Sequence, residues 1–136
     1  MNQSDEYNRR TIEAFRANGG KVEGHTHVLL LTHTGARSGE SRTTPMGYTP
    51  DGDRLIVIAS NFGAPTHPAW YHNLVAHPDV TVEVGTETFA ATAVVTEGAE
   101  RERLWTKAAE LHPYLVPQQA KTSRLLPVIA LSRRAD

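Results

Sequence analysis

The chain has 136 residues, the length of a single domain, which we predict to span residues 1–136. Fourteen Lys and Arg against fifteen Asp and Glu give a net charge of −1, which argues against a nucleic-acid-binding protein or a polybasic membrane-binding protein. The absence of cysteine excludes disulfides and thiolate metal sites, and the lack of a signal peptide or a long apolar run predicts a cytoplasmic protein with no integral membrane segment.

The first predicted element is an N-terminal helix over residues 4–18. Ser4 or Asp5 is a suitable N-cap, and Gly19-Gly20 supplies the conformation in which helices end. The apolar stripe of this helix is thin, which predicts a place on the surface or over a site. The sequence leaves open whether the helix is mobile, whether it caps the site and whether it touches a membrane surface.

Three strands and a helix follow. The apolar run over residues 27–33 predicts a buried strand, and residues 44–49 and 54–60 predict two more. Asp51-Gly52 between the last two is typical of a hairpin turn. Residues 68–77 predict a helix, because Pro68 suits the first turn and Pro78 stops it.

The second half of the chain predicts a hairpin over residues 79–85 and 88–96, an amphipathic helix over residues 100–111 and a last strand over residues 125–131. Residues 112–123 show no clear pattern. Hairpin connections outnumber crossovers, so we predict an α+β fold: a barrel-like sheet of six mainly antiparallel strands with flanking helices.

Residues 34–45 form the first candidate binding segment. Two glycines allow backbone N–H groups to converge, and the guanidinium groups of Arg37 and Arg42 suit a phosphate or carboxylate. The segment is not a Walker loop, because no Gly-Lys-Ser/Thr sequence and no predicted helix follow it. The alternative is an ordinary solvated hairpin loop.

Residues 59–67 form the second candidate segment, between a strand end and a helix N-terminus. Free N–H groups there suit the polar edge of a planar heterocycle, beside an aromatic face from Trp70 and Tyr71 and an amide from Asn73. The alternative is that Trp70 and Tyr71 anchor the core together with Leu74.

Neither a metal site nor a serine hydrolase is predicted. His67, His72 and His77 are spaced by five residues, which turns each step by about 140° around a helix, so the rings do not converge. Ser60 lies in no Gly-x-Ser-x-Gly sequence.

Residues 35–45, 67–74 and 77–82 together resemble the deazaflavin-dependent nitroreductase family, the small reductases that use coenzyme F420; residues 97–105 and 122–128 are similar as well. The resemblance implies a split β-barrel of the flavin-reductase type, in agreement with the strand order. It also implies a cofactor with a planar deazaflavin, a phosphate and an acidic oligoglutamate tail.

By this resemblance, loop residues line the phosphate and ring, two residues meet the polar edge of the ring, and helix residues close over it. The implied cofactor-binding residues are Arg37, Ser38, Arg42, Thr44, Pro45, Ser60, Asn61, Ala69, Trp70 and Asn73.

Three departures from the family pattern stand out. Ala36 occupies a position that is often basic in relatives, and Asn61-Phe62 replaces a frequent Lys-Gly. His112, Leu115 and Gln118 stand where nitro-reducing relatives carry clustered tyrosines, with only Tyr114 nearby, so we predict slow reduction of nitroimidazoles.

The resemblance therefore implies a reductase that transfers a hydride from reduced coenzyme F420 to a small acceptor: an activated alkene, a quinone or another conjugated carbonyl. Tyr48, Tyr114 or His112 is the predicted proton donor. Two alternatives stay open, an FMN-binding reductase of the same fold and a non-catalytic deazaflavin carrier. The predicted state is a monomer or a homodimer.

Overall fold

The computed structural model describes residues 3–134 and, in addition to a short 3₁₀ turn, contains four helices and seven strands. In chain order these are α1 (Gln3–Ala17), β1 (Val28–Thr34), β2 (Ser41–Gly47), β3 (Thr49–Asp51), β4 (Arg54–Ile58), the 3₁₀ turn η1 (Asn61–Gly63), α2 (Ala69–Ala76), β5 (Asp79–Val84), β6 (Glu87–Val95), α3 (Gly98–Leu111), α4 (Leu115–Ala120) and β7 (Val128–Arg133).

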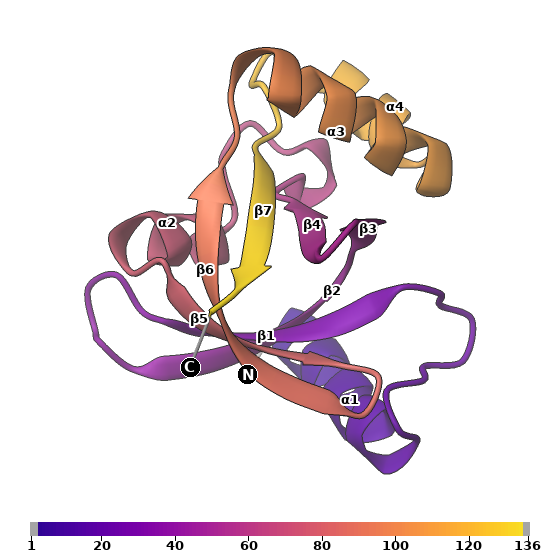
Figure 1. Ribbon diagram of the computed structural model, residues 1–136, viewed down its shortest axis with the longest axis vertical. Coiled ribbons are helices and arrows are strands. Elements are labelled where there is room, and N and C mark those ends of the chain that lie inside the picture. The colour runs from indigo at the N-terminus through magenta and orange to yellow at the C-terminus, as the bar shows by residue number, and fades with distance from the viewer. Residues whose placement is uncertain (1–2, 135–136) are drawn as a thin grey trace.

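The strands form one antiparallel sheet in the order β2-β1-β5-β6-β7-β4-β3. β2 and β3 lie at opposite edges of this sheet, although only Tyr48 separates them in sequence. The sheet must therefore curl until its two edges approach each other, as the predicted split barrel requires (Figure 1).

The strand count differs from the prediction, because the expected strand over residues 44–49 is divided at Tyr48. The N–H of Tyr48 still donates to the carbonyl of His27 at the β1 side (2.9 Å), whereas Thr49 already pairs with Ile56 of β4. One predicted strand thus becomes β2 and β3, and the sheet has seven strands rather than six.

The core fills the inside of the curled sheet. Leu29, Leu30 and Leu31 of β1 are fully buried, which explains the continuous apolar run. Leu74 of α2 packs into the cluster that contains Leu29 and Leu31, whereas Leu104 of α3 packs on the other face of β4 and β7. These two strands are therefore covered on both sides.

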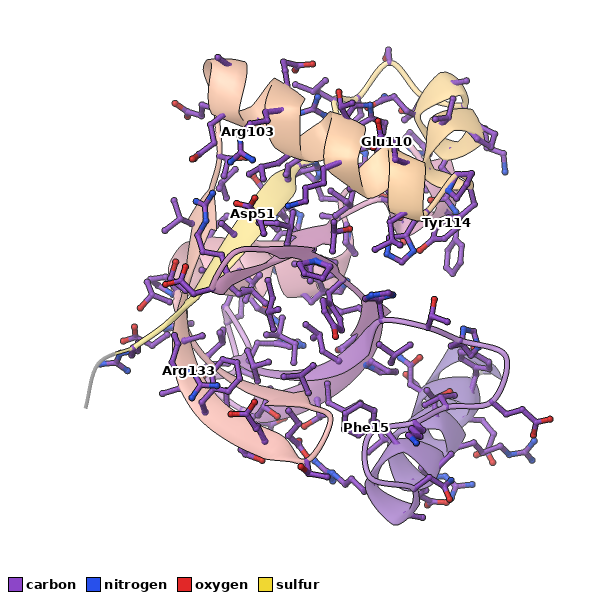
Figure 2. All side chains as sticks on the ribbon, turned by 45° about the vertical axis from the view of Figure 1, so that its right-hand side comes forward. Phe15, Asp51, Arg103, Glu110, Tyr114 and Arg133 are labelled. Atoms are coloured by element: carbon purple, nitrogen blue, oxygen red, sulfur yellow. The ribbon has the colours of Figure 1, made fainter. Side chains whose placement is uncertain are left out.

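The β3–β4 hairpin confirms the predicted turn at Asp51-Gly52, where Gly52 has a φ of +61°. The carboxylate of Asp51 accepts hydrogen bonds from Arg54, Arg103 and Lys107, so it ties α3 to the hairpin (Figure 2).

The N-terminal helix spans Gln3–Ala17, one residue earlier at each end than the predicted 4–18, and it packs against β2. Phe15 is buried and points from α1 toward the strands (Figure 2), and the guanidinium of Arg16 forms two hydrogen bonds with Glu83 of β5. The predicted cap at Ser4 lies outside the residues whose side chains are described.

The structure adds one helix to the predicted elements, α4, within residues 112–123. Pro117 conceals this helix in the sequence, but it stands in the first turn, where the N–H that proline lacks has no helical partner in any case. The last strand also begins later than predicted, at Val128. No helix within residues 3–134 is long and apolar enough to span a membrane.

Candidate active site

A cavity of about 670 Å³ opens between the sheet edges, the η1 turn and the helices α1, α2 and α4. A second hollow of about 450 Å³ adjoins it beneath α1 and shares Met46 and Gly47 of β2 with it. Tyr7 of α1 lines both spaces, so the N-terminal helix covers this side of the cavity.

The structure brings eight of the predicted site residues to the wall of the larger cavity. Five were predicted to bind the cofactor and three to donate a proton, and they come from four separate parts of the chain. They are Thr44, Pro45, Ser60, Asn61, Trp70, Tyr48, His112 and Tyr114.

The other five predicted residues do not line the cavity. Arg37 and Ser38 are exposed in the turn before β2, Arg42 is exposed on β2 itself, and Ala69 is exposed at the start of α2. Asn73 is buried, and its amide is engaged with other protein groups rather than facing the cavity.

Most backbone N–H groups of the turn before β2 already donate hydrogen bonds to protein acceptors. The N–H groups of Gly35 and Gly39 donate within the turn, at 2.8 and 3.0 Å, and the N–H of Ala36 donates to Oδ1 of Asn73 at 2.8 Å. Within the described residues the N–H groups of Arg37 and Ser38 have no protein acceptor. The groups that remain available for the predicted anion are therefore these two amides and the exposed guanidinium groups of Arg37 and Arg42.

Asn73 also connects this turn to the cavity through His33. Nδ2 of Asn73 lies 3.0 Å from Nδ1 of His33, and Nε2 of His33 lies 2.9 Å from Oγ1 of Thr44. Burial lowers the pKa of His33 to about 4, with a smaller contribution from the positive charge of Arg42. His33 is therefore neutral at physiological pH.

Arg124 fixes the loop on the opposite side of the cavity. Its guanidinium donates to the carbonyls of Ala59, Ser60 and Ala64 and to Nδ1 of His67, at 2.7 to 3.1 Å. Sequence analysis did not single out Arg124, because a lone arginine before a strand resembles any surface residue. Burial lowers the pKa of His67, and the nearby Arg124 charge adds to this effect.

The loop held by Arg124 has a strained backbone. Asn61 and Phe62 have φ values of +47° and +58°, in the left-handed region that favours glycine. The side chain of Phe62 is 80% exposed at the cavity mouth. The Phe62 ring therefore adds aromatic surface to the wall of the cavity.

The three predicted proton donors lie together. Nε2 of His112 donates to the carbonyl of Tyr48 at 2.9 Å, and the rings of His112 and Tyr114 meet edge to face at 5.6 Å. Burial raises the pKa of Tyr114, which keeps its phenol protonated. Gly47 faces this pair, because a Cβ there would lie 3.3 Å from the hydroxyl of Tyr114.

Sequence analysis missed the part of the apolar cavity wall that β2 and β4 contribute. Met46, Ile56 and Ile58 line it, and their alternation in strands looks the same whether they face a core or a ligand. Gln118 of α4 lines it as well, and no group within residues 3–134 hydrogen-bonds to its buried Oε1. Such an atom is satisfied when a ligand donates to it.

The family model of the F420H(2)-dependent quinone reductases matches residues 6–133 of this sequence. The chain belongs to this family. An F420H(2)-dependent quinone reductase of Mycobacterium tuberculosis, Rv1261c, is 40% identical to it over 119 residues, which cover 85% of this chain and 80% of the relative.

Two solved structures are similar over most of the chain. One is described as an F420-H2-dependent reductase, FDR-A; it is 37% identical, with a TM-score of 0.72 over 80% of this chain and 100% of the other. The second, described as a domain-swapped dimer, is 34% identical, with a TM-score of 0.76 over 96% of this chain and 100% of the other.

These similarities confirm the predicted family, the split-barrel fold and the oxidoreductase class of this F420H(2)-dependent reductase. Reduced coenzyme F420, the predicted cofactor, is the cofactor of the family.

Proposed function

We propose that this reductase transfers a hydride from reduced coenzyme F420 to a quinone. The observation that carries the proposal is the cavity, in which eight predicted site residues meet within a chain of the F420H(2)-dependent quinone reductase family. When bound, the reduced deazaflavin supplies the hydride, and one proton completes the two-electron reduction of a quinone carbonyl.

The residues present suit a planar, mostly apolar ring with polar edges. Ile58, Met46 and Leu115 offer apolar surface, while Thr44 and the unpartnered Oε1 of Gln118 offer polar contacts. A ring placed between these walls would be shielded from water beneath α1.

Arg37 and Arg42 suit the acidic part of the cofactor. Both side chains are exposed, and the carboxylate of Glu40 lies 3.9 Å from the guanidinium of Arg42. Arg42 and Thr44 lie on the same face of β2, since side chains two residues apart in a strand point the same way. The positive charge therefore lies at the Thr44 end of the cavity.

Tyr114 is the proton donor that the geometry favours. Its phenol lines both the main cavity and the second hollow, and its raised pKa keeps the proton on the oxygen. The Nε2 proton of His112 is already held by the carbonyl of Tyr48, which makes His112 a support for this wall.

Two measurements test the function. Titration of the purified protein with oxidised F420 and with FMN, followed by fluorescence, should show tighter binding of F420. Oxidation of reduced F420, followed by absorbance, should then depend on added menadione. Tighter binding of FMN would favour the flavin reductase, and F420 binding without turnover would favour the carrier.

A homodimer is the oligomeric state that the similarities favour, because a relative 34% identical to this chain is described as a domain-swapped dimer. Sedimentation velocity of the purified protein decides between this state and the monomer. A cytoplasmic location and a mobile N-terminal helix stay predictions.

A further inference from the structure

A chain of hydrogen bonds leads from the turn before β2 to the cavity. The N–H of Ala36 donates to Oδ1 of Asn73, the amide nitrogen of Asn73 meets Nδ1 of His33, and Nε2 of His33 meets Oγ1 of Thr44, all at 2.8 to 3.0 Å. Asn73 and His33 are 7% and 4% exposed. Thr44 is the member of the chain that reaches the cavity wall.

The backbone at Ala36 sets the direction of every bond in this chain. A backbone N–H can only donate, so the atom of Asn73 that faces Ala36 is its oxygen. The amide nitrogen therefore faces His33 and donates to Nδ1. A neutral imidazole with an accepting Nδ1 carries its hydrogen on Nε2, so His33 donates to Oγ1 of Thr44.

The hydroxyl of Thr44 is thereby left with one free hydrogen. Its oxygen accepts from His33, and within the described residues no protein acceptor takes the hydroxyl hydrogen. Since Thr44 lines the cavity, that hydrogen is available to a ligand.

We propose that Asn73 and His33 are positioning residues that fix Thr44 as a hydrogen-bond donor to the ligand in the cavity. The inference rests on the proposed function, under which the ligand is the deazaflavin cofactor. Thr44 then selects a ligand edge that presents an acceptor, such as a carbonyl or phosphate oxygen or an unprotonated ring nitrogen, over an edge that presents an N–H.

The substitution Asn73→Asp reverses the donor and acceptor roles along this series of hydrogen bonds, with almost no change in the shape of the side chain. A carboxylate accepts from both Ala36 and His33, so the imidazole hydrogen moves to Nδ1. Nε2 then becomes an acceptor, and Thr44 turns its hydrogen away from the cavity toward His33.

The first readout is ¹⁵N NMR of the ligand-free protein, which distinguishes a protonated from an unprotonated ring nitrogen. At a pH above 8, His33 should carry its hydrogen on Nε2 in the wild type and on Nδ1 in Asn73→Asp. A wild-type ring with its hydrogen on Nδ1 overturns the proposal, and this result needs no ligand and no variant.

The second readout is the affinity for oxidised F420, or for FMN if the wild type retains FMN instead. Asn73→Asp and Thr44→Val should each weaken binding about tenfold, the loss of one hydrogen bond, and the double variant should be no weaker than either. Thr44→Ser should recover most of the affinity that Thr44→Val loses.

Thr43→Val is the matched control. It removes a hydroxyl from the neighbouring residue of β2, where Oγ1 of Thr43 pairs with Oγ1 of Thr32 at 2.9 Å and does not line the cavity. Affinity should stay at the wild-type value.

Lowering the pH provides a further measurement, and its result would not change if Asn73 and His33 had a purely structural role. The new carboxylate raises the pKa of His33 in Asn73→Asp, against the opposing effects of burial and Arg42, so acid restores a hydrogen to Nε2. Binding by this variant should then recover, whereas Thr44→Val should gain nothing.

Additive losses in the double variant would show that Asn73 contacts the ligand directly and would overturn the proposal. Unchanged affinity in both single variants would do the same while leaving the proposed function intact. Wild-type protein that binds neither F420 nor FMN would instead overturn the proposed function and this inference with it.

Discussion

Arg124 donates from Nη1 to Nδ1 of His67 across 2.8 Å, and the same guanidinium donates to the carbonyls of Ala59, Ser60 and Ala64. One side chain from the segment before β7 thus holds a loop more than fifty residues earlier in the sequence. That loop forms part of the cavity wall. The conformation of this part of the wall therefore depends on Arg124, a residue outside the cavity.

Replacing this side chain should loosen the loop and destabilise the protein. Arg124→Met removes three hydrogen bonds to carbonyls, each contributing about 1 kcal/mol, so we expect a loss of about 3 kcal/mol in the free energy of unfolding. Urea unfolding measures this loss. Amide exchange at Gly63 and Ala64 should also accelerate.

Arg133→Met is the control, because Arg133 is exposed and pairs with Glu87 on the surface. It should change the free energy of unfolding by less than about 1 kcal/mol. Equal stability of the two variants would show that the Arg124 hydrogen bonds do not hold the loop.

The lowered pKa of His33 predicts how the free energy of unfolding depends on pH. The unfolded chain binds a proton at His33 near the ordinary pKa of 6.5, but the folded protein does so only near pH 4. Unfolding therefore takes up a proton between these values, so the contribution to stability is complete above about pH 6.5 and is lost as the pH falls toward 4. The shift corresponds to about 3 kcal/mol.

Urea unfolding of wild type and His33→Gln across this range measures the effect. The wild type should be the more stable protein at pH 7, and the difference should shrink steadily toward pH 4. A difference that stays constant between pH 7 and pH 4 would mean that His33 does not titrate as its buried position demands.

We expect Arg42 to make a salt-dependent contribution to the affinity for the cofactor. Its side chain is 62% exposed, so solvent and ions screen its attraction for a phosphate or an acidic tail. Arg42→Gln should weaken F420 binding about fivefold at low ionic strength, the upper range for an exposed charge pair, and much less in 0.5 M salt. Fluorescence titration at the two salt concentrations measures the change, with Arg133→Gln as the control. A loss that is independent of salt would place Arg42 in a shielded contact.

The hairpins and the helix near Pro68 were predictable because their signals are local. Asp51-Gly52 and the alternation of Val80 and Val82 specify turns and strands within a few residues. The division at Tyr48 was not predictable, because it depends on which edge of the sheet receives each backbone N–H. That choice is made only when the sheet curls.

The candidate site shows the same division between local and tertiary signals. Thr44, Ser60 and Trp70 were assigned to the cofactor by motif resemblance and do line the cavity. The bond between Asn73 and His33 joins residues forty positions apart, and no spacing rule predicts it. Sequence analysis included His33 only as the last residue of a buried strand and assigned Asn73 to the cofactor, because neither residue reveals its partner.

We expect the substitution of Tyr114 to have a large effect on turnover. Tyr114→Phe removes the phenol proton but keeps the ring, so kcat with menadione should fall about a hundredfold, the lower range for general acid catalysis. Stopped-flow oxidation of reduced F420 measures the rate. Affinity for oxidised F420 should change little, because the lost group acts on the acceptor.

Two further tyrosines serve as comparisons for Tyr114. Tyr71→Phe changes a ring that packs on His67 away from the cavity, and kcat should stay at the wild-type value. Tyr48→Phe should reduce kcat less than Tyr114→Phe, because Tyr48 lines only the main cavity. A larger effect of Tyr48→Phe would make Tyr48 the donor.

We expect the segment of residues 112–118, which contributes to the cavity wall, to decide which acceptor is reduced. His112, Tyr114, Leu115 and Gln118 all line it, and Tyr114 is the single phenol in this stretch. A nitro group gathers negative charge on two oxygens during reduction, and one phenol stabilises only one of them. A quinone requires one donor at a carbonyl oxygen and an apolar wall over its ring, which Tyr114 and Leu115 provide. Turnover of reduced F420 should therefore be much faster with menadione than with a bicyclic nitroimidazole, and equal rates would show that clustered phenols are not what nitro reduction requires here.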